Sequence, residues 1–229
     1  MQKNVVITGA SSGLGKEIAK IYLQKGNYNL ILCGRNEKGF DEFKNNTHVT
    51  LVIGDLTRKE TLADIEKQVK EIFGNQIDIL INNAGIIYIQ PFEKNTSEEL
   101  DRLLDIDLKA HMLLTQCLYP FMIAQKSGHV IFVNSTSGKE SRVNHTMYNA
   151  AKFGLTGFTN AFRLEAKQYN IRVTSFHPGG MNTDFYDEME GVPTASYMDP
   201  KEIAKILVYL SEIDPSIAPD EILLNRMTK

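Results

Sequence analysis

The first 25 residues constrain the fold more than any other stretch of this chain. Asn4–Thr8 is a short run rich in β-branched residues, which is typical of a buried strand. Gly9–Gly15 contains three glycines, and Lys16–Lys25 repeats apolar residues at helical spacing until Gly26 ends the pattern. Glycines let the backbone approach a ligand closely, and the free N–H groups at a helix start attract anions. The stretch therefore predicts a strand, a phosphate-binding turn and a helix; the alternative is a tight connection that binds nothing.

Strand-like and helix-like segments alternate along the rest of the chain. This alternation predicts an α/β protein with a single doubly wound parallel sheet of about seven strands, a Rossmann fold, with helices on both faces. There is no repeat and no linker, so we expect one domain over residues 1–229, with a short substrate lid at about residues 181–199. Further strands are predicted at Tyr28–Cys33, His48–Ile53, Ile77–Ile81, His129–Val133, Ile171–Phe176 and Glu221–Leu224, and helices at Glu37–Lys44, Thr61–Phe73, Leu100–Ala124 (bent at Pro120), Tyr148–Tyr169 and Pro200–Ile213.

Composition and charge exclude several classes of partner. The 229 residues carry a formal net charge of −3 and no basic run, which argues against binding to nucleic acid or to an anionic membrane. Ala110–Ala124, the longest mainly apolar stretch, is too short and too polar to span a bilayer. Only Met1–Lys3 precede the first predicted strand, so no signal peptide is expected. Cys33 and Cys117 are interpreted as buried free thiols, and we expect a cytoplasmic protein without a metal site.

Polar, glycine and proline residues follow the predicted strands. In a doubly wound sheet, ligands bind at the carboxyl ends of the strands. An acidic residue at the end of the second strand would hold an NAD ribose, whereas Arg35 suits the 2′-phosphate of NADP; the alternative is an exposed surface arginine. Asp55 could accept a hydrogen bond from an adenine amino group or cap a helix. These strand ends are Gly9–Gly15, Gly34–Arg35, Asp55, Asn82–Gly85, Ser135 and Pro178–Gly179.

Ser135, Tyr148 and Lys152 bring a hydroxyl, a phenol and an amine into one stretch of the chain. Tyr148 and Lys152 are four residues apart, so in a helix they share one face. A lysine ammonium beside a phenol favours the phenolate and lowers the tyrosine pKa. Such a tyrosine can act as a general acid or base near neutral pH. Taken alone, the spacing also fits an ordinary surface lysine beside a half-buried tyrosine.

Together these motifs resemble the short-chain dehydrogenases/reductases. The branch with shorter subunits carries Thr-Gly-x-x-x-Gly-x-Gly, present here as Thr8–Gly15, and Asn-Asn-Ala-Gly, present as Asn82–Gly85. It also carries Tyr-x-x-x-Lys with a serine thirteen residues earlier, and Pro-Gly-x-x-x-Thr, present here as Pro178–Thr183. The motifs occur in the expected order over roughly residues 3–215, and as a set they are highly specific.

The resemblance implies an NADP-dependent carbonyl reductase or alcohol dehydrogenase, with reduction the expected direction. Tyr148 would be the general acid/base, Ser135 would polarise the substrate oxygen, and Lys152 would tune Tyr148 and hold the nicotinamide ribose. The alternative is a non-catalytic NADP-binding sensor or scaffold; a sugar-nucleotide epimerase would need a larger domain after the sixth strand. Besides Tyr148 and Lys152, the implied contacts to NADP(H) are Thr8, Gly9, Ser11, Ser12, Gly13, Leu14, Gly15, Gly34, Arg35, Asn36, Asp55, Leu56, Asn83, Ala84, Gly85, Pro178, Gly179, Gly180, Met181 and Thr183.

The chain departs from the family pattern at two places. Asp107 stands where the family has a catalytic asparagine that anchors a water relaying protons to the lysine. We hypothesise that Asp107 keeps this relay and shifts the pH optimum; the alternative is a solvated helix carboxylate. The C-terminus also lacks the glycine-rich final strand that packs across a tetramer axis in many relatives. We therefore expect a homodimer formed by the two long helices, with a tetramer as the alternative.

The lid is expected to contact the carbonyl or alcohol substrate through its larger side chains. A histidine close before Tyr148 also resembles a catalytic base, but we interpret it as a solvated loop histidine. The candidate lid contacts are Phe185, Tyr186, Met189 and Tyr197, and the candidate residues around the mouth are Phe92, Lys139, Glu140, Arg142 and His145.

Overall fold

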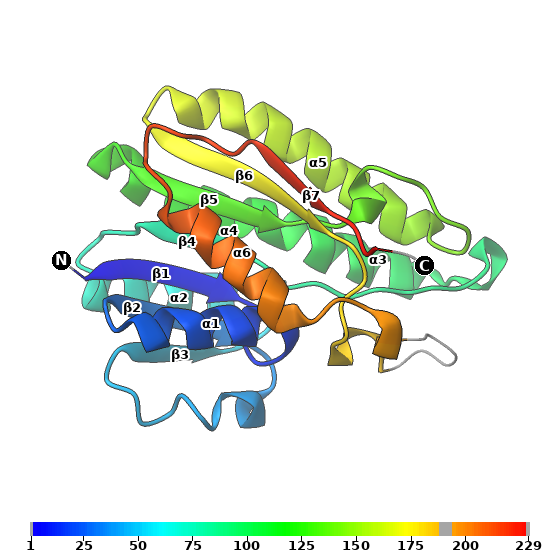
Figure 1. Cartoon of the computed structure of the whole chain (residues 1–229), viewed down its shortest axis with the longest axis horizontal. Coiled ribbons are helices and arrows are strands. Elements are labelled where there is room, and N and C mark those ends of the chain that lie inside the picture. Colours follow the sequence, from blue (N-terminus) through cyan, green and yellow to red (C-terminus); the bar gives the residue numbers. More distant parts are fainter. Residues whose placement is uncertain (1, 188–193, 228–229) are drawn as a thin grey trace.

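A single parallel sheet forms the centre of the computed structural model, which describes residues 2–187 and 194–227 (Figure 1). Its strand order is β3-β2-β1-β4-β5-β6-β7, and every pairing is parallel. Because β1 and β4 are neighbours, the order of strands reverses between them, as in doubly wound folds. The predicted fold class is confirmed. The strands are β1 (Lys3–Thr8), β2 (Tyr28–Gly34), β3 (Val49–Ile53), β4 (Ile79–Asn82), β5 (Gly128–Val133), β6 (Ile171–Pro178) and β7 (Glu221–Leu224).

Helices cover both faces of the sheet, because its central strands are apolar on both sides. In β1, Val5 and Ile7 belong to the core under α1 and α6, whereas Val6 belongs to the core under α2, α4 and α5. In Figure 1, α1 and α6 lie in front of the sheet and α2 and α4 behind it. The helices are α1 (Gly13–Lys25), α2 (Lys59–Ile72), α3 (Ser97–Leu104), α4 (Ala110–Gln125), α5 (Thr146–Lys167) and α6 (Pro200–Glu212).

The long helix predicted at Leu100–Ala124 is present but is not continuous. A π-helical turn at Asp105–Lys109 separates α3 from α4, while Pro120 lies inside α4. π turns widen a helix locally and are frequent at functional sites. The interruption therefore lies at Asp105–Lys109, before the proline where a bend was expected, and it contains Asp107.

Other expectations differ from the structure in detail. Glu37–Phe40 forms only a short 3₁₀ turn, where a helix was predicted over Glu37–Lys44. Cys33 is buried and free, but the free Cys117 is only partly buried, because α4 presents one side to solvent. Across residues 2–187 and 194–227, no helix is both long and apolar enough to cross a bilayer.

Candidate active site

The β1–α1 turn has the backbone that its glycines predict. Gly9 and Gly13 adopt positive φ angles of 63° and 49°, which side-chain-bearing residues rarely take. Gly15 lies in the first turn of α1, where a Cβ atom would overlap the carbonyl oxygen of Gly9. The Ser12 side chain makes no capping hydrogen bond to the helix start. The first N–H groups of α1 are therefore available to an anion.

Thr8 fixes this turn to the end of β4. Its hydroxyl oxygen accepts hydrogen bonds from the backbone N–H groups of Asn83 and Ala84, at 2.9 and 3.1 Å. The Asn83 side chain in turn donates to the carbonyl oxygens of Thr8 and Gly9, at 2.9 and 3.2 Å. Two motifs 75 residues apart therefore form one rigid unit.

A cleft of about 580 Å³ runs along the carboxyl ends of the strands. It brings together most of the residues predicted to bind the cofactor or to catalyse. Thr8, Gly15, Asp55, Asp107 and Gly180 do not line it; Thr8 and Gly15 contact the turn instead. The predicted residues that line it are Gly9, Ser11, Ser12, Gly13, Leu14, Gly34, Arg35, Asn36, Leu56, Asn83, Ala84, Gly85, Ser135, Tyr148, Lys152, Pro178, Gly179, Met181 and Thr183.

Tyr148 and Lys152 lie on one face of α5, as their spacing predicts. The Lys152 Nζ is 5.5 Å from the centre of the Tyr148 ring. Both side chains are buried, with exposed fractions of 5% and 3%. The interpretation as an ordinary surface lysine beside a half-buried tyrosine is therefore wrong.

Asp107 forms a buried ion pair with Lys152. Its Oδ1 lies 2.8 Å from the Lys152 Nζ, and its Oδ2 accepts a hydrogen bond from the Ile86 N–H at 2.9 Å. Asp107 is fully buried, which excludes a solvated helix carboxylate. Among the residues that the structure describes, these two are the only buried members of the Asp, Glu, Lys and Arg types. Burial raises the pKa of Asp107, and the nearby ammonium and the Ile86 N–H oppose this shift.

The pKa of Tyr148 shifts in the direction opposite to the sequence-based expectation. Burial raises it well above its ordinary value, and the negative charge of Asp107 raises it further. A hydrogen bond with Ser135 and the positive charge of Arg142 lower it, but by less. The spacing argument considered Lys152 without its counter-ion and without the loss of solvent. The Tyr148 hydroxyl therefore holds its proton at neutral pH, which suits a proton donor.

His111 is a buried group near this pair that the sequence reasoning missed. It lies four residues after Asp107 and is 1% exposed. Burial and the charge of Lys152 lower its pKa to about 3, so the imidazole is neutral at physiological pH. A histidine in the middle of an apolar helix pattern was the available signal.

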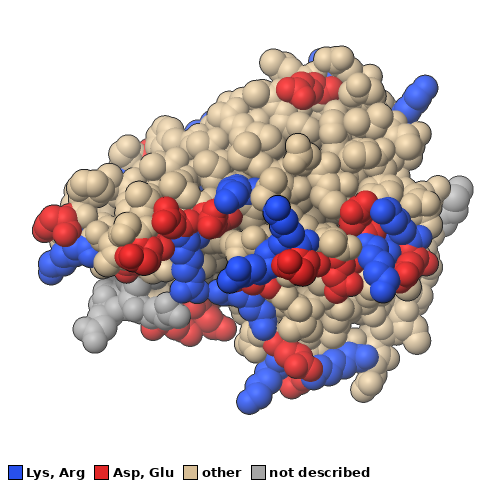
Figure 2. Space-filling view, turned by 180° about the vertical axis from the view of Figure 1, so that it is seen from behind, with Lys and Arg blue, Asp and Glu red and all other residues tan. Residues whose placement is uncertain are grey.

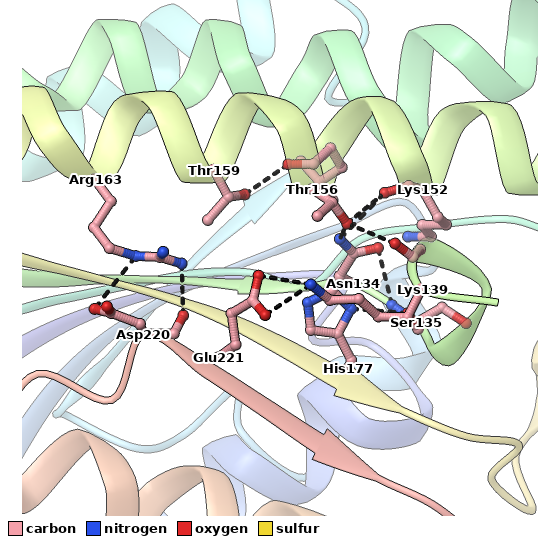
Figure 3. Close-up of polar contacts among 12 residues, drawn as sticks. Asn134, Ser135, Lys139, Lys152, Thr156, Thr159, Arg163, His177, Asp220 and Glu221 are labelled. Carbon is pink, nitrogen blue, oxygen red and sulfur yellow. Dashed lines mark hydrogen bonds and ion pairs between the residues drawn. The ribbon is translucent and has the colours of Figure 1, made fainter.

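Asn134, directly after β5, was also missed and fixes the position of the segment from Ser135 to Lys152 (Figure 3). Its Oδ1 accepts from the Ser135 N–H at 3.0 Å, and its Nδ2 donates to the Thr156 hydroxyl at 2.9 Å and the Lys152 carbonyl at 3.3 Å. On the other side, His177 Nδ1 lies 2.9 Å from the Ser135 carbonyl oxygen. These contacts hold the end of β5 against α5, so Ser135 and Lys152 have fixed relative positions. The sequence signal for Asn134 was a polar residue at a strand end.

Arg35 and Asp55 lie at neighbouring strand ends but differ in role. Arg35 is exposed and lines the cleft, where its guanidinium is available to a ligand. Asp55 Oδ1 instead accepts from the Thr57 N–H and hydroxyl, at 2.9 and 2.8 Å. Burial raises the pKa of Asp55, but those hydrogen bonds and the charges of Arg35 and Arg58 outweigh it, and the net pKa is lowered. Because Arg58 precedes α2 as its N-cap, Asp55 does not cap that helix.

A second cavity of about 560 Å³ shares Ser135 and Tyr148 with the cleft. Of the expected lid and mouth residues, Phe185 and Tyr186 line the cleft, and Tyr197, Glu140, Arg142 and His145 line the second cavity. Phe92 and Lys139 line neither, and Met189 lies outside the described residues. The His145 ring is hydrogen-bonded to the Val143 carbonyl oxygen at 2.8 Å and is partly exposed, as expected for a loop histidine.

The cleft residues that were not predicted by any motif are Gly54, Ile86, Ile87, Tyr88, Arg102, Ile106, Val133, Asn134 and Asp184.

The fold and the cleft define the class of doubly wound nucleotide-binding proteins, and comparison with known proteins identifies the family. The family model described as short chain dehydrogenase matches residues 3–191. An uncharacterized oxidoreductase of Staphylococcus saprophyticus is 31% identical, over 99% of this chain and 96% of the relative. The chain belongs to the short-chain dehydrogenase/reductase family.

Two solved structures extend the comparison. A metagenomic short-chain oxidoreductase in complex with NADP is 26% identical, with a TM-score of 0.84, and the match covers 99% of this chain and 98% of that one. A 3-ketoacyl-(acyl-carrier-protein) reductase of Brucella melitensis, complexed with NADH, is 26% identical, with a TM-score of 0.85, over 96% and 95% of the two chains. Nicotinamide cofactors with and without the 2′-phosphate therefore occur among its structural neighbours.

Proposed function

We propose that this chain is an NADP(H)-dependent oxidoreductase that reduces a carbonyl compound to an alcohol. The observation that carries the proposal is that Ser135, Tyr148 and Lys152 line the same cleft as the β1–α1 turn. A ligand bound along the cleft touches both the phosphate-binding turn and the Tyr148 hydroxyl. This combination suits a dinucleotide-dependent reaction. A turn that only connects a strand to a helix would not need it.

The residues present fit the cofactor. The positive-φ glycines Gly9 and Gly13 and the uncapped start of α1 would hold the pyrophosphate. Lys152 would bind the ribose hydroxyls next to the nicotinamide. When bound, NADPH supplies the hydride that is added to the carbonyl carbon.

The chain itself supplies the proton and fixes the position of the substrate oxygen. The Tyr148 hydroxyl would give its proton to the carbonyl oxygen, and the phenolate would recover a proton from solvent. Ser135 Oγ accepts from the Ser137 N–H at 3.0 Å, so this contact does not use the Ser135 O–H. The Ser135 hydroxyl is hydrogen-bonded to Tyr148, and with substrate bound it would donate to the substrate oxygen instead. Asp107 would hold Lys152 in place and keep Tyr148 protonated, which favours reduction at neutral pH.

Arg35 supports the preference for NADP over NAD. Its guanidinium is exposed at the end of β2, and neighbouring Gly34 and Asn36 line the same part of the cleft without a carboxylate. A guanidinium matches a 2′-phosphate in charge and in hydrogen-bonding geometry.

The function is tested by following NADPH oxidation with a panel of diketones and aldehydes, for wild type, Tyr148→Phe and Tyr209→Phe. We expect turnover by wild type and a loss of about 10²–10⁴-fold in kcat for Tyr148→Phe, with the Kd for NADPH unchanged. Tyr209 is 69% exposed on α6, so its variant serves as the control. NADPH binding without turnover of any carbonyl in wild type would instead favour the non-catalytic sensor or scaffold.

We also propose a cytoplasmic homodimer formed through α4 and α5. α4 contains no charged residue, and Figure 2 shows few charged side chains over the upper part of this side of the molecule. Phe153 and Leu164, on α5, are 44% and 70% exposed. Exposed apolar side chains on a face with few charges favour association. Light scattering would give twice the 25.8 kDa chain mass for a dimer.

A further inference from the structure

The second cavity is placed to hold the substrate of the proposed reaction. It has a volume of about 560 Å³ and adjoins the cofactor cleft. The two spaces share Ser135 and Tyr148, together with Ile87, Gly179 and Tyr186. A carbonyl compound in this cavity can therefore present its oxygen to the two hydroxyls while the rest of it contacts the cavity wall.

The wall of this cavity carries two arginines. Arg142 and Arg226 both line it, with Glu140 as its only acidic residue within the described chain. Among residues 2–187 and 194–227, no carboxylate lies within 4.0 Å of either guanidinium. Arg226 is otherwise engaged, since its Nη1 donates to the Ser196 hydroxyl at 2.9 Å and its guanidinium lies 5.2 Å from the centre of the Tyr197 ring. Arg142 is therefore the cation most available to a ligand.

The neighbouring cation of the same loop shows the contrast. Lys139 is bonded to the Glu221 carboxylate at 2.7 Å, across the edge of the sheet, and does not line the cavity (Figure 3). One loop thus presents one neutralised cation and one without a carboxylate partner among the described residues. An unpaired guanidinium at a cavity wall favours an anionic ligand.

The backbone around Arg142 is fixed rather than free. The Asn149 side chain, which is 7% exposed, accepts from the Arg142 N–H at 3.3 Å and donates to the Ser137 and Glu140 carbonyls at 2.6 and 2.9 Å. The Arg142 Nη2 donates to the hydroxyl of buried Thr136 at 3.3 Å. Asn149 directly follows Tyr148, so the loop is positioned by the same turn of α5 that carries the phenol. The guanidinium is close enough to lower the pKa of Tyr148.

We propose that the substrate is an anionic carbonyl compound, whose carboxylate or phosphate group is bound by Arg142 in the second cavity. The inference rests on the proposed function, because it names the class of substrate that Tyr148 would protonate. A guanidinium offers parallel N–H groups to two oxygens of either anion. This contact would hold the far end of the substrate while the carbonyl oxygen meets Ser135 and Tyr148.

The test compares pairs of related carbonyl compounds in which one member carries an anionic group and the other is neutral. The pairs are acetoacetate with methyl acetoacetate, 4-oxopentanoate with its methyl ester, and dihydroxyacetone phosphate with dihydroxyacetone. We expect wild type to favour the anion of at least one pair by about ten- to hundredfold in kcat/KM. Whether the acids or the phosphate are favoured distinguishes the two anions.

The variants are Arg142→Gln, Arg142→Lys and, as the control from the same loop, Lys139→Gln. Arg142→Gln is expected to bring the ratio of anion to neutral substrate close to one, mainly through KM, and Arg142→Lys to restore part of it. Lys139→Gln should leave the ratio as in wild type. Equal use of anion and neutral partner by wild type, or a preference that survives in Arg142→Gln, would overturn the inference while leaving the proposed function intact.

Binding decides the same question without turnover. Isothermal titration of acetoacetate, 4-oxopentanoate and dihydroxyacetone phosphate into Tyr148→Phe saturated with NADP⁺ should show binding of at least one of them, which Arg142→Gln in the same background abolishes. If wild type reduces no carbonyl at all, the proposed function fails, and this titration still supports or rejects the anion site.

Discussion

The two halves of the sheet build their parts of the cleft by different physical means. On the β1–β3 side, the cleft is shaped by backbone: Gly9, Gly13 and the start of α1 face it, and Arg35 meets solvent. On the β4–β6 side, the properties of the cleft depend on the buried charges of Asp107 and Lys152. Recognition of a phosphate needs N–H groups and close approach, whereas control of a proton needs charges shielded from water.

Only the β4–β6 side carries the free-energy cost of burying charges. Burying a charged pair is unfavourable unless each ion keeps good partners, and breaking such a pair is expensive. The first half instead depends on the absence of side chains, and it tolerates no added atoms at its close contacts. Substitutions should therefore separate the two halves: added volume abolishes binding of the cofactor, and altered charge changes the pH dependence of the chemistry.

The largest effect is expected from added volume at Gly15. A Cβ atom there meets the Gly9 carbonyl oxygen and the Asn83 side chain, so Gly15→Ala must displace the turn. We expect a loss of about 1–3 kcal/mol in the free energy of unfolding, together with loss of measurable NADPH binding. Denaturant unfolding and fluorescence titration measure both.

Gly157→Ala is the matched control, because it makes the same change within α5 at a position with no atom within 4 Å of the added Cβ. It should leave NADPH binding intact and raise stability by about 0.5–1 kcal/mol. If Gly15→Ala bound NADPH as wild type does, the close-approach role of Gly15 would be wrong.

A smaller, selective effect is expected at Arg35. Arg35→Ala should weaken NADPH binding by about ten- to hundredfold and leave NADH binding within about twofold, because only the 2′-phosphate is lost as a partner. Arg58→Ala is the control: Arg58 also lowers the pKa of Asp55 but does not line the cleft. Equal weakening of both cofactors in Arg35→Ala would refute the NADP preference.

The smallest effect is a shift on the pH axis. Asp107 raises the pKa of Tyr148, so Asp107→Asn should lower it. Alcohol oxidation, which needs the phenolate, would then begin at lower pH, and carbonyl reduction, which needs the phenol, would be lost at lower pH. Measured pH–rate profiles in both directions give the sign.

Asp105→Asn tests whether the effect on the pH profile requires a buried carboxylate such as that of Asp107. Asp105 lies in the same π turn but pairs with Lys109 at the surface, at 3.0 Å. Its neutralisation should leave the profile where it is, since solvent screens that pair. Identical profiles for wild type and Asp107→Asn would show that the buried carboxylate does not act on Tyr148.

The sequence was sufficient to predict the sheet and the residues that gather at its edge. Strand–helix alternation requires parallel strands, and parallel strands end at one edge, so Gly9, Asn83 and Ser135 had to converge.

What the sequence did not reveal depends on burial and on the neighbours of each charge. The direction of the Tyr148 pKa shift follows from solvent exclusion and from Asp107, and neither is visible in the Tyr-x-x-x-Lys spacing. The π turn arises from a local change in hydrogen bonding that no residue type indicates, whereas the sequence predicted a bend at Pro120. Asn134 and His111 act through contacts with distant segments, so local pattern gave them no role.

Transfer of deuterium tests the central claim most directly. Wild-type enzyme, an accepted carbonyl compound and [4,4-²H₂]NADPH are expected to give an alcohol with one deuterium on the former carbonyl carbon, detected by mass spectrometry. Tyr148→Phe should bind the same cofactor yet form this product at least about a hundredfold more slowly. An alcohol without deuterium, or equal rates of labelled product from both enzymes, would contradict the account.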